Sequence, residues 1–125
     1  MRRWTSLVLV FGLLLATAGF HAIGFAADQG KTVTVKGEVI DTACFFAKGK
    51  RGAKHAKCAK MCVQGGVPAA LLTDDGQIYI LNEMHDNAEP FEQVKEHAGE
   101  VVTVKGILIE KGGVKMIFVQ EVTTS

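Results

Sequence analysis

The stretch KTVTVKGEVI, Lys31–Ile40, alternates between apolar and polar side chains along its length. An alternation with a period of two, carried by β-branched residues, predicts a strand that is buried on one face only. A glycine at position 37 falls on the apolar side, which indicates a bend or a close approach of another backbone. The side predicted to face the core carries Val33, Val35 and Val39, and the opposite side carries Thr32, Thr34, Lys36 and Glu38.

The central part of this stretch occurs a second time in the chain. Val33–Gly37 and Val102–Gly106 have the same sequence, VTVKG. In a five-stranded OB-fold barrel the first and fourth strands are neighbours, so glycines at matching positions would let both strands bend together. The alternative interpretation is that VTVKG is a generic strand composition with no structural correspondence between the two copies.

The rest of the chain predicts a hairpin, a helix and a second hairpin. The tripeptide Asp74-Asp75-Gly76 joins two apolar runs, and Asp-Gly between such runs is typical of a tight hairpin turn. A helix is expected over residues 87–98, where Asn87 can cap the start, Pro90 suits the first turn and Gly99 ends the helix. The strands expected after the first are Ala70–Thr73, Gln77–Leu81, Val101–Ile109 and Val114–Val122.

Residues 42–66 differ in composition from the predicted barrel and form an insert after its first strand. The insert holds all three cysteines, and no acidic residue occurs between Asp41 and Asp74. We expect one short helix inside it, from about Lys54 to Val63. The whole order predicts a mainly β domain, a small five-stranded OB-fold-like barrel with one helix between strands 3 and 4 and a Cys-rich helical insert after strand 1.

The chain resembles the small exported OB-fold-like domains found in bacteria. The resemblance covers nearly all of residues 31–122 and rests on the order of the elements and on the two VTVKG strands. It implies a barrel but says little about activity, because such folds host many unrelated functions. The stretch from Gly37 to Cys44, followed by His55-x-x-Cys58-Ala-x-x-Cys62, also resembles a pattern of uncharacterised secreted bacterial proteins, which implies no particular function.

The N-terminal residues have the composition of a secretory signal peptide. Two early arginines precede an uncharged apolar run, Leu7–Ala18, and small residues follow up to Ala27. A basic start, a short apolar core and a small-residue exit are typical of such peptides. We therefore expect cleavage near Ala27, a single domain over residues 28–125, and a periplasmic or secreted protein that meets the membrane only during export. The alternative is an uncleaved N-terminal anchor built on Leu7–Ile23.

Cys44, His55, Cys58 and Cys62 form the candidate site. If residues 54–63 are helical, the last three share one helix face, and the helix can fold back toward Cys44. Three thiolates and one imidazole are a closed tetrahedral set for Zn²⁺, and soft sulfur ligands also suit Cu(I). The sequence therefore predicts an exported binding protein with a Cys₃His metal site, and zinc is favoured over copper. The spacing Cys-x10-His-x2-Cys-x3-Cys is not that of a standard zinc finger.

Three alternatives to metal binding use the same residues. In an exported protein Cys44 could pair with Cys58 or Cys62 and staple the insert to the barrel, or the last two could pair with each other. One thiol would then stay beside His55, which leaves thiol–disulfide exchange open. Haem is disfavoured, because the Cys-x3-Cys segment is one residue too long for covalent attachment and is followed by Val63 rather than by histidine.

The insert is also the most basic part of the chain. Nearby cations are expected to lower the pKa values of the thiols and to offset the charge of a thiolate-rich site. They also predict an unknown protein or other anionic partner. The residues concerned are Lys48, Lys50, Arg51, Lys54, Lys57 and Lys60.

Other functions find weaker support in the sequence. The chain has 125 residues and a formal net charge of +1, which gives no bulk attraction to nucleic acid, and export would put it in the wrong compartment. No hydrolase triad, phosphate loop or metalloprotease motif is visible, so nothing indicates an enzyme. Met84-His85-Asp86 is a minor candidate for copper, and His97 is expected to interact with a helix C-terminus. Asp74 and Asp75 are interpreted as turn residues.

Overall fold

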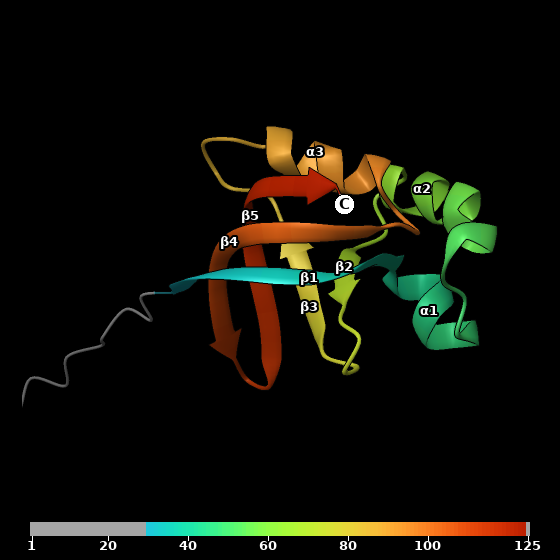
Figure 1. Cartoon of the computed structure of the whole chain (residues 1–125), viewed down its shortest axis with the longest axis horizontal. Helices are drawn as coiled ribbons and strands as arrows, with labels where there is room; N and C mark the ends of the chain where they lie inside the picture. The colour runs from blue at the N-terminus through green and yellow to red at the C-terminus, as the bar shows by residue number, and fades with distance from the viewer. Residues whose placement is uncertain (1–29, 125) are drawn as a thin grey trace, which may run out of the picture.

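The computed structural model describes residues 30–124, so the predicted signal peptide at residues 1–27 lies outside the described residues (Figure 1). Five strands form a closed barrel in the order β1-β2-β3-β5-β4. Strands β3 and β5 pair in parallel, and the other four pairings are antiparallel. The predicted five-stranded OB-fold-like barrel is thereby confirmed. The strands are β1 (Lys31–Asp41), β2 (Ala69–Leu72), β3 (Ile78–Asn82), β4 (Val101–Lys111) and β5 (Val114–Thr124).

The two VTVKG copies pair with each other. They lie on β1 and β4 in antiparallel register, so that the glycine of each copy lies opposite the first valine of the other. A Cβ atom on Gly37 would lie 2.6 Å from the carbonyl oxygen of Leu72, and one on Gly106 would meet the carbonyl oxygen of Phe118. Both glycines therefore permit the close backbone approach that the sequence predicts. The interpretation of VTVKG as a generic composition is wrong.

Within residues 30–124, four helical segments accompany the barrel, and three of them are α-helices, one more than the sequence predicts there. The segment that the sequence did not predict is α1, whose first turn is capped by the Asp41 side chain and whose end is closed by Gly49 in a left-handed conformation. No helix within residues 30–124 has the length and apolar character to cross a membrane. The segments are α1 (Thr42–Lys48), the 3₁₀ turn η1 (Ala53–His55), α2 (Ala56–Gln64) and α3 (Glu89–Glu96).

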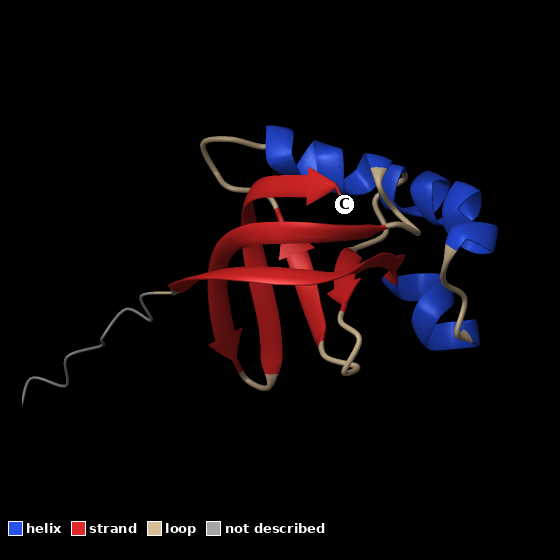
Figure 2. Cartoon of the chain, in the orientation of Figure 1, coloured by secondary structure: helices blue, strands red, loops and turns tan. Residues whose placement is uncertain are grey.

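Helices α3 and α2 lie at the end of the barrel away from the two hairpin turns, and α1 lies beside the end of β1 (Figure 2). Helix α2 contributes Ala59 and Val63 to the main core, and α3 with the residues after it contributes Val94 and Ala98. This core fills the barrel interior. A smaller apolar cluster lies elsewhere on β1 and β2, where Phe45 of α1 packs against it. The buried residues of that cluster are Ile40, Ala70 and Leu72.

The second half of β1 departs from the predicted alternation. Its last five residues, Gly37–Asp41, are all buried, whereas the first half alternates as expected. Glu38 is only 6% exposed, so its predicted position on a solvent-facing side is wrong. The physical reason is the insert, which brings Arg51 and Gly52 onto the Glu38 carboxylate. The covered half of β1 becomes the base of the candidate site.

Candidate metal centre

Asp41 is the buried anchor of the site. It ends β1, and none of its side chain is exposed. One carboxylate oxygen accepts a hydrogen bond from the Cys44 amide at 2.7 Å, and the other lies 2.9 Å from His55 Nε2. Burial raises the pKa of Asp41, but hydrogen bonds from the Cys44 amide and from His55 outweigh it and leave that pKa below its usual value. Asp41 is therefore ionised at neutral pH.

An ionised Asp41 also decides which nitrogen of His55 can bind a metal ion. A carboxylate can only accept hydrogen bonds, so His55 Nε2 carries the proton between them. In the neutral imidazole, the other ring nitrogen, Nδ1, then has the lone pair that a metal ion needs. Metal-binding histidines commonly donate their second ring N–H to a carboxylate, which orients the ring and makes it a better ligand. Asp41 and His55 have that arrangement.

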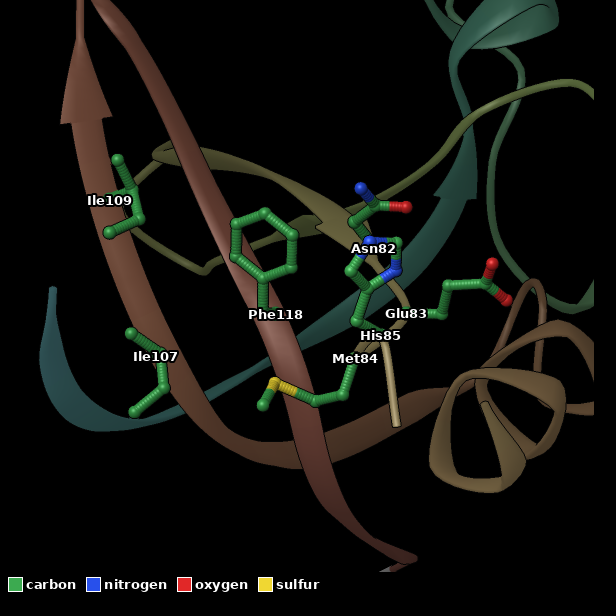
Figure 3. A pocket seen from close by; sticks show the side chains of 7 residues that line it. All are labelled: Asn82, Glu83, Met84, His85, Ile107, Ile109 and Phe118. Carbon is green, nitrogen blue, oxygen red and sulfur yellow. The ribbon is translucent and has the colours of Figure 1, made fainter. Parts of the chain in front are cut away.

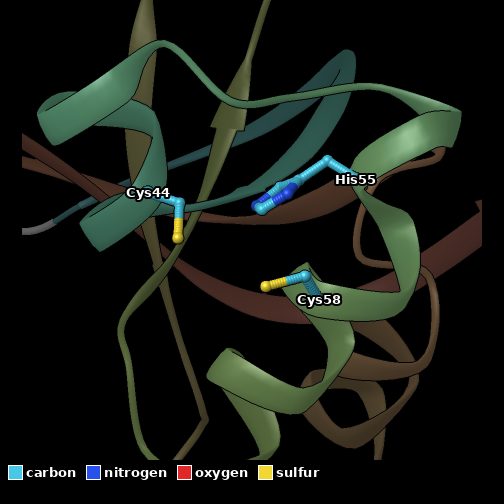
Figure 4. Close-up of side chains that lie close together, drawn as sticks. All are labelled: Cys44, His55 and Cys58. Atoms are coloured by element: carbon cyan, nitrogen blue, oxygen red, sulfur yellow. The ribbon is translucent and has the colours of Figure 1, made fainter.

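Three side chains from three different elements meet beside this pair. The ligand atoms of Cys44 on α1, His55 on η1 and Cys58 on α2 all lie within 4.8 Å of one another. Figure 4 shows the two sulfur atoms turned toward each other and the imidazole directed into the same space. In a tetrahedral zinc site with bonds of about 2.0–2.3 Å, neighbouring ligand atoms lie roughly 3.3–3.8 Å apart. A contraction of about 1.5 Å or less would therefore bring these three onto one ion.

Cys62 occupies a slightly different place from the other three predicted ligands. The Cys62 sulfur lies within 4.8 Å of ligand atoms of Asp41 and Cys44. These three residues form a second set, which shares only Cys44 with the first. The two sets overlap, so all four residues predicted from the sequence lie in one neighbourhood. The expected single helix face is wrong in one respect, because α2 begins at Ala56 and His55 ends the preceding 3₁₀ turn.

Asp41 is the functional residue that sequence reasoning missed, although a signal for it exists. The inward positions of β1 are the odd-numbered ones, from Val33 to Val39, and Asp41 continues that series. An acid on the inward side of a strand needs a buried partner. The partner is His55, from the only Cys/His-rich segment of the chain.

The thiols of Cys44 and Cys62 are protonated at neutral pH. Burial, followed by the negative charge of Asp41, raises the pKa of Cys44 to about 11. Burial, followed by the charge of Cys58, raises the pKa of Cys62. The prediction that basic neighbours lower the thiol pKa values is wrong for these two residues, because desolvation and negative neighbours dominate over the lysines. A metal ion must therefore displace thiol protons when it binds.

The thiols of Cys44 and Cys58 open onto a cavity of about 500 Å³, which we call the basic cavity. Arg51 at its edge forms an ion pair with Glu38 at 3.0 Å, and Glu38 also accepts a hydrogen bond from the Gly52 amide. Four of the six predicted basic residues line the cavity, whereas Lys57 and Lys60 do not. The lining residues are Cys44, Lys48, Gly49, Lys50, Arg51, Lys54, His55 and Cys58.

The minor copper candidate lies in a separate cavity of about 510 Å³ on the barrel (Figure 3). Met84 and His85 line it together with apolar side chains of β4 and β5. In the part of the chain that the structure describes, His85 belongs to neither set of three metal-binding groups. The other lining residues are Asn82, Glu83, Ile107, Ile109 and Phe118.

The remaining predicted polar residues have local partners. His97 Nδ1 lies 2.9 Å from a carboxylate oxygen of Glu100, just after α3. Asp75 accepts a hydrogen bond from the Thr73 hydroxyl, which lowers the pKa of Asp75, and it lies in the β2–β3 turn as predicted.

The geometry thus brings three thiols and an oriented imidazole together at the surface of the insert. All three cysteines lie in the described part of the chain and are free thiols. Such a group could hold a metal ion or form a thiol pair. Comparison with protein-family models, with curated proteins and with solved structures gives no match to this chain.

Proposed function

We propose that the chain is an exported metal-binding module that holds one ion through Cys44, His55, Cys58 and Cys62. The observation that carries the proposal is the meeting of Cys44, His55 and Cys58 within 4.8 Å, from three separate elements. Cys62 supplies the fourth donor from the adjoining set. The mixed set of sulfur and nitrogen ligands favours zinc, because copper(I) is better served by sulfur alone.

The position of the site favours an ion that can exchange. Cys58 is exposed, and Cys44 and Cys62 are only partly buried, so the ion would sit near solvent. Binding would also link α1, η1 and α2, since each provides a ligand. The composition of residues 1–27 supports export to the periplasm or beyond, where an unprotected thiol would meet oxidants. Ligation by metal protects thiols in such a compartment.

A second candidate function is a disulfide-stapled interaction domain that binds an anionic partner through the basic residues. The proximity of the Cys44 and Cys58 sulfur atoms supports it. A disulfide that closes a loop of about fifteen residues stabilises a fold by roughly 3 kcal/mol in the chain-entropy model. One thiol would remain, and exchange chemistry at that thiol belongs to the same candidate.

Native intact mass distinguishes the two candidates. The protein is exported to a periplasm and purified without chelator or reductant. A mass that includes one metal ion, less the displaced thiol protons, supports the metal site. A metal-free mass that is two hydrogens short supports the disulfide and contradicts the metal site.

The matched variants are Cys58→Ser and Thr124→Ser. The first removes one ligand from an exposed position, so the metal-free fold should be unchanged while zinc affinity falls at least 100-fold. The second is a conservative change at the end of β5, far from the donors in the sequence, and should leave zinc binding unchanged. Competition titration with a chromophoric chelator measures both. Equal zinc affinity in Cys58→Ser and the parent would contradict the proposal.

A further inference from the structure

The four donors of the proposed site differ in how they face the basic cavity. Cys44, His55 and Cys58 all line it, and Cys62 does not. Cys62 is also the donor that shares its close set only with Cys44 and Asp41. An ion held by the first three donors would keep a fourth coordination position, for which Cys62 and a ligand in the cavity would compete. Cys62 is thus the one donor of the four that lies outside both the first close set and the cavity lining.

The cavity is large enough for a small molecule and is strongly cationic. Its volume of about 500 Å³ falls within the ordinary range of ligand pockets. Lys48, Lys50 and Lys54 line it, and in the described residues 30–124 none of these three forms an ion pair. Arg51 is already paired with Glu38. Among the residues that the structure describes, no acidic side chain lines the cavity, so three ammonium groups without an acidic partner lie along its wall.

The metal donors and the lysines together indicate which class of small molecule the basic cavity could bind. A ligand that competes with a thiolate for zinc or copper(I) needs a soft donor of its own, and a second thiol meets that need. A ligand that gains from three ammonium groups needs negative charge, and carboxylates are the common carriers of it. A small thiol that bears carboxylates combines the two properties.

We infer that the basic cavity admits a small carboxylate-bearing thiol, which replaces Cys62 on the bound metal ion. This inference rests on the proposed function. In the exchange, the metal–sulfur bond to Cys62 breaks and a metal–sulfur bond to the incoming ligand forms. The proton of the incoming thiol ends on the Cys62 sulfur, so charge and atoms balance and no electron is transferred. The module would thus hold its ion in a ternary complex with a small anionic thiol.

The test uses the exported protein loaded with Co²⁺, whose absorption reports its thiolate ligands. Mercaptosuccinate is the charged thiol, β-mercaptoethanol is the uncharged thiol and succinate is the anion without a thiol. We expect mercaptosuccinate to bind at least tenfold more tightly than β-mercaptoethanol. Alkylation followed by peptide mass mapping should show that mercaptosuccinate exposes Cys62 while Cys44 and Cys58 stay protected. Succinate should expose none of them.

Charge variants test the role of the cavity itself. The double variant Lys48→Glu/Lys54→Glu should lower mercaptosuccinate affinity about tenfold or more at low ionic strength, with cobalt still bound. Lys57→Glu is the matched control, because Lys57 lies on the same insert but does not line the cavity, and it should change that affinity less than twofold.

The outcomes separate this inference from the proposed function. If cobalt binds but the two thiols bind equally, or Cys62 stays protected when mercaptosuccinate saturates, the inference is overturned and the metal site stands. Equal losses in the cavity variant and in Lys57→Glu also overturn it, as does removal of cobalt from the protein by the ligand. If no cobalt binds to the parent protein, the proposed function fails and the inference fails with it.

Discussion

The barrel and the insert are held together by different kinds of interaction. The barrel interior is apolar, and residues such as Leu71, Val104 and Ile117 have no exposed surface at all. Helix α1 of the insert has no buried residue. It is attached through Phe45, which is partly buried, and through the hydrogen bond from its Cys44 amide to Asp41. The barrel is held by a packed apolar core, whereas α1 is held by a few contacts with β1 and β2.

This difference shows how a small domain can keep a reactive surface site on a rigid support. Burial of apolar area makes the barrel cooperative, since the loss of any part exposes the rest. The first part of the insert, residues 42–55, can open locally at a lower cost, because none of these residues is buried. Two buried carboxylates of β1, Glu38 and Asp41, define where the insert sits. Asp41 of the barrel thus positions Cys44 and His55, although both residues lie outside the barrel interior.

The largest effect is expected from a cavity in the barrel core. Ile117→Ala should lower the free energy of unfolding by about 2–5 kcal/mol, because a fully buried side chain leaves a void. Urea denaturation followed by circular dichroism measures the loss. Val114→Ala on the same strand is the control, since Val114 is 51% exposed and should change stability by less than about 0.5 kcal/mol. Similar losses in both variants would mean that the barrel is not the cooperative unit.

A bound metal ion should stabilise the insert and leave the barrel unchanged. Zinc at 100 times its dissociation constant stabilises the conformation that binds it by about 2.7 kcal/mol. That gain should appear as roughly 100-fold slower hydrogen exchange at amides of residues 42–66 that exchange by local opening. Mass spectrometry of exchanged peptides measures it, and Cys58→Ser should show no such slowing. Equal slowing throughout the barrel in the parent would argue against a locally opening insert.

The two regions also differ in what could be predicted from sequence. The barrel depends on local patterns, namely alternation, tight turns and the paired VTVKG copies, and each pattern appears in the structure except in the second half of β1, which is buried throughout. The four candidate ligands were found because cysteine and histidine are chemically conspicuous. Helix α1 was missed because its seven residues have no periodic apolar face, and its ends depend on Asp41 and Gly49.

The electrostatics of the site could not be predicted for a related reason. The many lysines of the insert are visible in the sequence, but the burial of Cys44 and its contact with Asp41 arise only when α1 folds against β1. Distance and desolvation then outweigh the number of charges. Glu38 shows the same effect, because its burial depends on a loop that comes more than ten residues later in the chain.

Acid should open the insert before the barrel in the metal-free protein. The pKa of Asp41 lies below its ordinary value of 3.8 in the folded state. Its carboxylate therefore stabilises the fold fully above about pH 4, and the contribution is lost as the pH falls through the lowered pKa. The protection factor of the Cys44 amide against hydrogen exchange, followed by NMR between pH 5 and 2, should fall below about pH 4. Amides of β4 and β5 should stay protected over the same range.

Asp41→Asn is the control for this acid transition. An asparagine keeps an acceptor for the Cys44 amide but has no carboxyl group to titrate. The variant should have a less protected insert at neutral pH and little further change on acidification. An identical acid transition in the variant and the parent would assign the effect to another group.

The smallest effect is expected at Glu38, the second carboxylate under the insert. Glu38→Gln keeps an oxygen that can accept from the Gly52 amide and loses only the charge opposite Arg51. Because the Arg51 side chain is 54% exposed, the ion pair is screened by water and should contribute roughly 0.5 kcal/mol. Arg51→Gln should cost about as much, and the double variant should cost little more than either alone, as a double-mutant cycle requires of a direct pair. Additive losses would show that the Glu38 and Arg51 side chains do not interact directly. The Gly52 amide would then be the contact through which Glu38 holds the insert, and charge would contribute less at Glu38 than at Asp41.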